Sequence, residues 1–145
     1  MRPRATGTSW WRIYKASDTA HIGAISRTFR LVVYRAAITG IHADATGDDR
    51  RNLNGEYALV RNTGAAAINL AGWNLDAGDR SQRFSLASYP LKKGATVRIH
   101  TGRGTNRAGH LFLGSGRPIW NNDGDTATLI DPHNIAVSRY RYESP

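Results

Sequence analysis

The sequence predicts an all-β fold, an antiparallel β-sandwich of about eight to nine strands, and three observations support this prediction. Short apolar-rich segments recur from residue 36 onwards with turn residues between them, which is the spacing expected of a sandwich. Apolar and polar residues alternate within several segments, so each strand has one face available for a core. No segment has the apolar period of a long helix. The length of 145 residues, 40% of them hydrophobic, suits one domain with a buried core.

The predicted strands follow one another along the chain, each bounded by turn residues. In residues 96–101, Val97 and Ile99 alternate with polar side chains, so the apolar pair is expected to face the core. Residues 56–62 alternate in the same way. The other segments predicted as strands are 37–43, 67–70, 73–76, 83–86, 110–113, 126–131 and 135–142.

Asn, Asp and Gly residues mark the predicted turns. The run NNDGD around Asp123 and Gly124 is typical of a hairpin, because these residue types tolerate positive φ. Its side chains are also oxygen ligands of the kind that calcium prefers. However, the alternating ligand positions and the final Glu of an EF-hand loop are missing. We therefore expect a hairpin turn here and no metal site.

The positive charge is concentrated near the N-terminus. The formal net charge is +9. Residues 1–35 carry seven basic side chains and one acidic one, whereas residues 36–145 carry 13 basic and 10 acidic ones. We expect residues 1–35 to form a basic extension, either docked or loose, with a short strand at 29–34. Residues 36–142 are expected to form the sandwich and residues 143–145 a tail.

Neither an export signal nor a membrane span is visible. The first residues lack the apolar stretch of a signal peptide, and no run of about 20 apolar residues occurs. The sequence as given therefore predicts no export, and the compartment stays open. Cysteine is absent, which excludes disulfides and thiolate metal sites.

Residues suited to catalysis are not recognisable in the sequence. His100 and His110 flank the loop 101–109 and are placed to face each other across a hairpin. Two imidazoles without a third His or a carboxylate make a poor zinc site. Converging carboxylates and a serine in a G-x-S-x-G elbow are also missing. We therefore expect no enzyme activity, no cofactor and no metal.

Four arginines at or near loops form the candidate binding set. Arg98, Arg103, Arg107 and Arg117 would form an anion-binding rim at one end of the sandwich. The alternative is that these side chains are only solvated, which is common for arginines in loops. The set is a candidate contact site for anions or nucleic acid.

Four segments in this order resemble the lamin tail domain, an immunoglobulin-like β-sandwich, and look closest to its bacterial forms. They are LNGEYALVRNTG (53–64), INLAGWNL (68–75), LKKGATVRIHTGRGTN (91–106) and GRPIWNNDGDTATLID (116–131). Each segment alone is a weak signal, whereas the ordered set is specific. The resemblance implies structural roles for the residues at the family-motif positions, and the two tryptophans are expected in the core. These residues are Glu56, Asn62, Gly72, Trp73, Gly94, Trp120, Asn122, Gly124 and Asp125.

The resemblance implies a non-catalytic binding or scaffolding module with a protein or cell-surface partner. Exposed edge strands would allow a partner strand to pair with the sheet. Two alternatives stay open: electrostatic binding of nucleic acid through the basic extension and the loop arginines, and service as an accessory domain of a hydrolase or nuclease. Bacterial relatives are often exported. A rod with heptad repeats is not present in the sequence, so filament assembly of the lamin kind is not expected.

Overall fold

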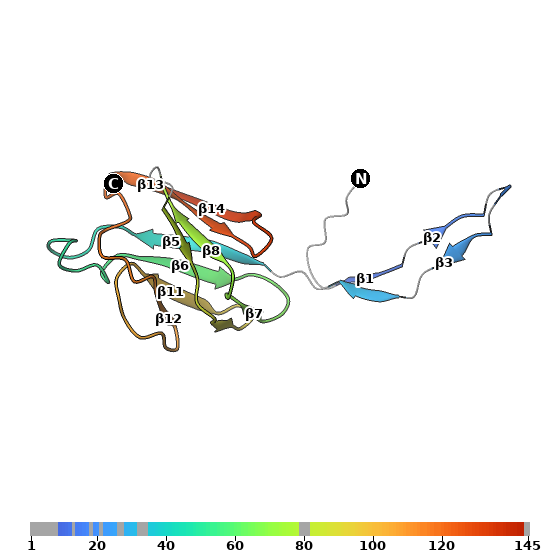
Figure 1. Ribbon diagram of the computed structural model, residues 1–145, viewed down its shortest axis with the longest axis horizontal. Coiled ribbons are helices and arrows are strands. Elements are labelled where there is room, and N and C mark those ends of the chain that lie inside the picture. Colours follow the sequence, from blue (N-terminus) through green and yellow to red (C-terminus); the bar gives the residue numbers. More distant parts are fainter. Residues whose placement is uncertain are drawn as a thin grey trace.

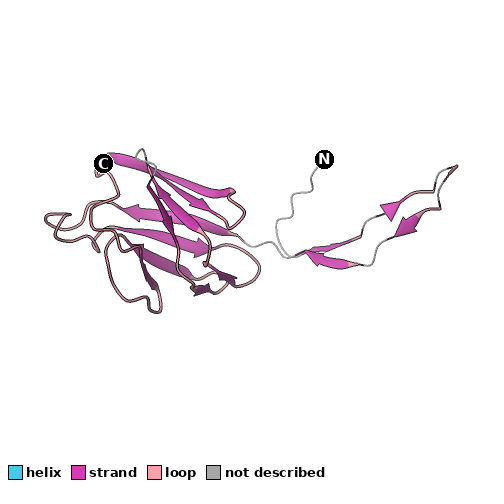
Figure 2. Cartoon of the chain, viewed as in Figure 1, coloured by secondary structure: helices cyan, strands magenta, loops and turns pink. Residues whose placement is uncertain are grey.

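In the part of the chain that the computed structural model describes, strands are the only regular secondary structure (Figure 2). The residues that it describes are 9–12, 14–17, 19–20, 22–25, 28–31, 35–78 and 82–143. The predicted all-β class is therefore confirmed. No helix in these residues has the length and hydrophobicity needed to cross a membrane.

Two four-stranded sheets form a sandwich (Figure 1). The first sheet has the order β12-β11-β6-β5, with β5 (Ala36–His42), β6 (Tyr57–Asn62), β11 (Thr96–His100) and β12 (His110–Phe112). The second has the order β14-β13-β8-β9, with β8 (Asn74–Ala77), β9 (Gln82–Ser85), β13 (Gly124–Ile130) and β14 (Ala136–Glu143). A short pair, β7 (Ile68–Asn69) and β10 (Pro90–Leu91), completes this part of the chain.

One strand pair runs parallel within the otherwise antiparallel sandwich. Strand β12 lies alongside β11 in the same direction, so residues 101–109 form a crossover loop. His100 and His110 are therefore not on opposite sides of a hairpin, and the predicted hairpin is wrong at this point. The two histidines still become neighbours, because the parallel register brings β12 next to β11.

The run NNDGD is not a hairpin turn either. Strands β12 and β13 belong to different sheets, and Gly124 is already the first residue of β13. The turn before it is closed by the Gly124 amide, which donates to the Asn121 carbonyl at 3.1 Å. The hairpin in this region joins β13 to β14 at residues 131–135, where Asn134 adopts a φ of 61°.

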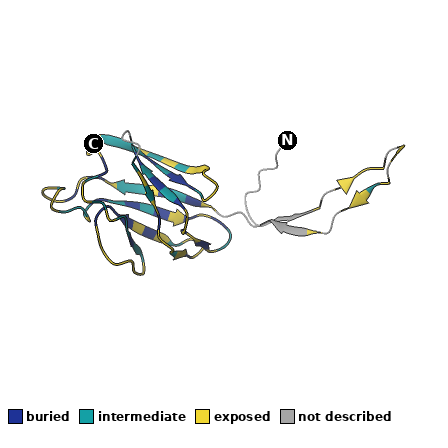
Figure 3. Ribbon diagram, in the orientation of Figure 1, coloured by how far each residue is buried: buried dark blue, intermediate teal, exposed yellow. Residues whose placement is uncertain are grey.

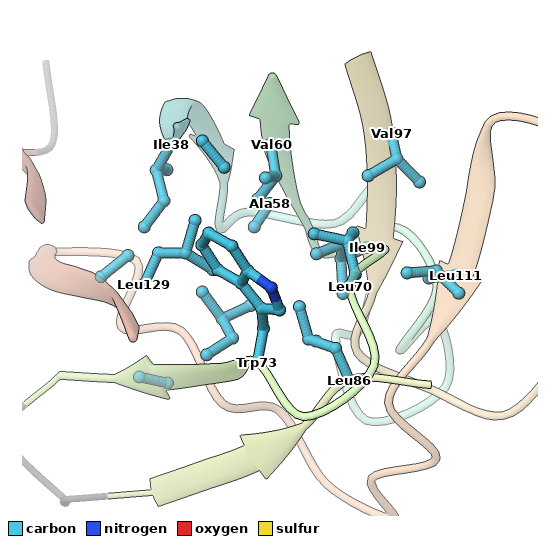
Figure 4. Packing of buried hydrophobic residues seen from close by; sticks show 14 of the residues in the cluster. Ile38, Ala58, Val60, Leu70, Trp73, Leu86, Val97, Ile99, Leu111 and Leu129 are labelled. Carbon is cyan, nitrogen blue, oxygen red and sulfur yellow. The ribbon is translucent and has the colours of Figure 1, made fainter. Parts of the chain in front are cut away.

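The core lies between the two sheets and centres on Trp73. Figure 4 shows its indole between Ala58 and Val60 of β6 and Leu129 of β13. Trp73 is only 5% exposed, and Trp120 belongs to the same buried cluster. Figure 3 shows that buried residues alternate with half-buried or exposed ones along inner strands such as β6 and β8. The alternation read from the sequence thus corresponds to inward and outward faces.

The two sheets meet along β5 and β14. The Ile38 amide of β5 donates to the hydroxyl of Ser138 on β14 at 3.0 Å. These two edge strands therefore cover each other. Tyr140 and Tyr142 of β14 are half-buried and pack against the core cluster.

Four short strands form two pairs before the sandwich. Strand β1 (Ser9–Trp11) pairs with β4 (Phe29–Leu31), and β2 (Tyr14–Lys15) pairs with β3 (Ala24–Ile25). The strand predicted at 29–34 is thus present in its first half, and residues 32–34 lie outside the described residues. The side chains of Tyr14 and Ile25 are largely exposed.

Candidate functional site

A row of ring side chains crosses the outer face of the first sheet. The register places His42 of β5 opposite Tyr57 of β6. Tyr57 lies opposite His100 of β11, which lies opposite Phe112 of β12. The ring centroids are 4.9 Å, 5.9 Å and 4.8 Å apart along this series, which are contact distances for ring pairs. We refer to these four residues as the ring row.

Two guanidinium groups lie over rings of this row. The Cζ atom of Arg98 is 4.3 Å from the centroid of Tyr57, and that of Arg107 is 5.5 Å from the centroid of Phe112. Cation–π attraction at an exposed site contributes about 0.5–1 kcal/mol, which favours this position of the side chain over others. Neither arginine forms an ion pair with a described carboxylate. Both positive charges therefore remain available to a ligand.

His100 is held by two hydrogen bonds and is only 7% exposed. Its Nδ1 lies 2.8 Å from the Asn54 carbonyl oxygen, and its Nε2 lies 2.9 Å from Nδ1 of His110. A carbonyl oxygen only accepts, so the proton of neutral His100 is on Nδ1. Its Nε2 then accepts from Nδ1 of His110. This tautomer leaves Nε2 of His110 as the acceptor of the pair.

The environment of His100 lowers its pKa below the ordinary value of 6.5. Burial is the largest cause, and the electrostatic effects of His110, Arg98 and Arg107 act in the same direction. The hydrogen bond to the Asn54 carbonyl opposes them. His100 is thus favoured in its neutral form, which matches the hydrogen bonds that it makes.

The four predicted arginines do not form a single rim. Arg98 and Arg107 lie on the outer face of the first sheet with the ring row. Arg103 lies in the loop after β11, where its carbonyl accepts from Asn54 Nδ2 at 2.9 Å. Arg117 lies in another loop, where its amide and carbonyl bond to the Ser115 hydroxyl. The ring row was not predicted from the sequence, because its members occupy outward positions of separate strands whose order the sequence does not show.

Asn62 stabilises the connection after β6. It is fully buried, and its Nδ2 donates to the carbonyls of Ala66 and Leu91, each at 2.9 Å. Its Oδ1 accepts from the Gly64 amide at 2.9 Å. All its hydrogen-bonding groups are used by nearby backbone, which gives this family-motif residue a structural explanation.

Two of the motif glycines are in positions that suit no other residue well. Gly94 has a φ of 74° in the turn before β11, and Gly72 has a φ of 79° before Trp73. The left-handed region costs other L-residues free energy because of their Cβ atom. At Gly124, which starts β13, a Cβ would lie 2.9 Å from the Tyr142 carbonyl oxygen.

Glu56 is a fully buried residue directly before β6. Its Oε2 accepts from the Ile119 amide at 3.2 Å. Its Oε1, the hydroxyl of Thr101 and the indole nitrogen of Trp120 have no partner with hydrogen-bond geometry. Burial raises the pKa of Glu56, while the Ile119 amide and the nearby Thr101 hydroxyl act against this increase. Trp120 is thus buried in the core, as expected, and its indole nitrogen has no acceptor among the described residues.

The oxygen-rich turn before β13 uses its side chains for internal bonds. Asn122 Nδ2 donates to Asp49 at 2.8 Å, and Asn121 Oδ1 accepts from the Asp123 amide at 3.1 Å. Asp125 accepts from the amide of Thr126 at 2.6 Å. Within the described part of the chain, three or more His, Asp or Glu side chains nowhere gather in a way that could hold a metal ion.

Most of the chain matches the model of one known protein family. The family model described as Lamin Tail Domain matches residues 35–144. No curated protein matches the chain. The matched range includes both sheets of the sandwich and the whole ring row.

Proposed function

The chain belongs to the lamin tail domain family, and from this premise we propose that it is a non-catalytic binding module. Its ligand is an acidic segment of a partner protein, held on the outer face of the sheet β12-β11-β6-β5. The observation that carries the proposal is the pair Arg98 and Arg107. Each guanidinium lies over a ring and has no ion-pair partner among the described carboxylates.

The two arginines are suited to binding carboxylates. A guanidinium that lies over a ring still has N–H groups free to form paired hydrogen bonds with a carboxylate. Little side-chain entropy is then lost on binding, because the rings already restrict Arg98 and Arg107. Tyr and Arg are also the residue types enriched where protein interfaces concentrate their binding energy.

The sheet face is a better candidate than the free edge at β12. The His110 amide donates to the Arg107 carbonyl at 2.9 Å, and the Phe112 amide donates to Asn106 Oδ1 at 3.0 Å. The loop before β12 thus occupies the amides that a partner strand would need. Strand β5 is covered by β14, which leaves β9 as the open edge in the described sandwich.

A fluorescently labelled polyglutamate peptide is a direct probe for this proposal. Anisotropy titrations with the full chain should give saturable binding, and Arg98→Gln should weaken it about tenfold through loss of a charge-assisted hydrogen bond. The matched control is Arg139→Gln, which removes the same charge from an exposed position on β14 of the other sheet. Equal weakening by both substitutions would mean that binding follows net charge alone, and the proposal would be wrong.

Single-stranded nucleic acid is a second candidate ligand, which the combination of rings and guanidinium groups favours. Its affinity should fall steeply with salt, because phosphate contacts release counterions. Titrations of labelled oligothymidylate at several salt concentrations measure this slope, and loss of Arg98 should reduce it. If Arg12→Gln with Lys15→Gln weakens the oligonucleotide complex more than Arg98→Gln does, the N-terminal extension is the main contact.

A further inference from the structure

A pocket lined by three arginines lies at the loop end of the sandwich, apart from the ring row. Its volume is about 300 Å³. It is formed by the loop before β6, the loop after β11 and the loop after β12. The lining residues are Arg50, Arg51, Asn52, Leu53, Asn54, Gly102, Arg103, Ser115 and Gly116. The lining contains no carboxylate.

Hydrogen bonds join the three loops. Asn54 Nδ2 donates to the Arg103 carbonyl at 2.9 Å, which connects the loop before β6 to the loop after β11. The Ser115 amide donates to the Thr101 carbonyl at 2.9 Å, and the Gly114 amide donates to the Gly102 carbonyl at 2.9 Å. The floor of the pocket is therefore built before any ligand binds, which lowers the entropic cost of binding.

The nearby acids compensate only part of this charge. Asp48 Oδ2 lies 3.7 Å from Nε of Arg51, a contact between two exposed side chains. The other oxygen of Asp48 accepts from the Arg50 backbone amide at 3.0 Å. Asp49 is bonded to the Ala45 amide and to Asn122. The guanidinium groups of Arg50 and Arg103 have no ion-pair partner among the described residues.

We propose that this pocket is a binding site for a phosphate group, with Arg50 and Arg103 as its principal ligands. A phosphate monoester carries a charge of about −1.5 to −2 and three acceptor oxygens, so it can accept from guanidinium groups on two sides at once. A carboxylate carries one charge and accepts in one plane. A volume of about 300 Å³ is at the small end of ligand pockets and suits one such group.

The site is separate from the surface assigned to the acidic segment. Asn54 contacts both. Its backbone carbonyl accepts from His100 of the ring row at 2.8 Å, and its side-chain Nδ2 donates to the Arg103 carbonyl. The charged ligands are nevertheless different residues. Either proposal can therefore fail without the other.

The test is an NMR titration of the ¹⁵N-labelled full chain with inorganic phosphate and, in a second arm, with O-phosphoserine. Saturable shifts of the Gly102, Arg103 and Ser115 amides are expected. Stronger binding of O-phosphoserine would identify a phosphate carried on an organic group as the ligand, and equal or weaker binding would identify the free ion. Absence of saturable shifts at these amides in both arms would overturn the proposal.

Variants show whether the arginines bind the group directly. Arg50→Gln combined with Arg103→Gln should weaken phosphate binding at least about tenfold, whereas Arg139→Gln should not change it. Equal weakening by Arg139→Gln would mean non-specific attraction and would refute the site. Arg50→Lys with Arg103→Lys retains the charge but loses the forked geometry, so it should bind more weakly than the wild type. If the glutamine variant misfolds, this lysine variant decides the question, because unchanged affinity there would contradict the proposal.

Discussion

Arg83 and Arg141 of the second sheet differ from Arg98 and Arg107 of the first in what they contact. On the second sheet, Arg83 of β9 forms a two-pronged ion pair with Asp76 of β8, at 2.8 Å and 2.9 Å, and Arg141 lies 3.0 Å from Glu143. On the first sheet, Arg98 and Arg107 lie over rings instead. In an ion pair the positive charge of the arginine is compensated by a carboxylate of the same surface. A ring contact restricts the arginine but does not neutralise its charge. This difference in the surroundings of the arginines is the basis of our proposal that the first face binds an anionic ligand.

Removal of the Tyr57 ring should have the largest effect on stability and on polyglutamate binding at the first sheet. Its ring stacks on His42 and supports Arg98, so Tyr57→Ala should lower the free energy of unfolding by about 2 kcal/mol. It should also weaken polyglutamate binding, because Arg98 loses its support. Urea denaturation and anisotropy measure the two effects.

The matched control for this variant is Tyr57→Phe, since no described residue forms a hydrogen bond with the Tyr57 hydroxyl. It should retain the stability within about 0.5 kcal/mol and keep the affinity. If Tyr57→Phe were as damaging as Tyr57→Ala, the ring contacts would not be the cause.

The pH dependence of stability tests the ring row at His100. Its folded pKa lies below the unfolded value of 6.5, so the unfolded chain binds more protons between these two values. The contribution of His100 to stability is therefore complete above pH 6.5 and is lost as the pH falls from 6.5 to the lower folded pKa. Urea denaturation across this range should show the decrease.

The substitution His100→Asn should remove this part of the pH dependence. Its side-chain amide can still donate towards Asn54 but does not titrate. A variant of the exposed His133 on the loop between β13 and β14 serves as the control and should retain the decrease. An unchanged pH profile in His100→Asn would show that other groups cause it.

The smallest expected change comes from the second sheet. Asp76→Asn removes the ion pair of Arg83 and leaves this arginine without a carboxylate partner on the second sheet. Because the pair is exposed, the midpoint of thermal unfolding should fall only slightly. Polyglutamate binding at the second sheet should increase a little. It should remain weaker than at the first sheet, since no contact between Arg83 and a described ring restricts this side chain as Tyr57 restricts Arg98. Binding there as strong as at Arg98 would mean that the rings contribute nothing.

The sequence predicts the sandwich well because each strand carries its own two-residue alternation. In β11, Val97 and Ile99 are fully buried while Arg98 is exposed, as expected from their positions. The ring row could not be predicted in the same way, because it depends on which strands are neighbours. His42, Tyr57, His100 and Phe112 lie on four strands whose order and direction are set by tertiary packing.

The arginine pocket was missed for a related reason. In the sequence, Arg50 and Arg51 directly follow Asp48 and Asp49, which suggests a loop that is charge-paired within itself. In the structure, Asp49 contacts Asn122, which is 73 residues away, and Asp48 contacts Arg51 weakly. Arg50 therefore has no acidic partner among the described residues, although two acids precede it in the chain.

The contact between Ile38 and Ser138 has a consequence for the rate of folding. The bond joins residues that are 100 positions apart, and β5 and β14 are the first and last strands of the sandwich. Closing so long a segment costs chain entropy before the contact can form. Domains dominated by such distant pairings fold in milliseconds to seconds. The seam between the sheets should therefore close late, after each sheet has assembled around its own neighbouring strands.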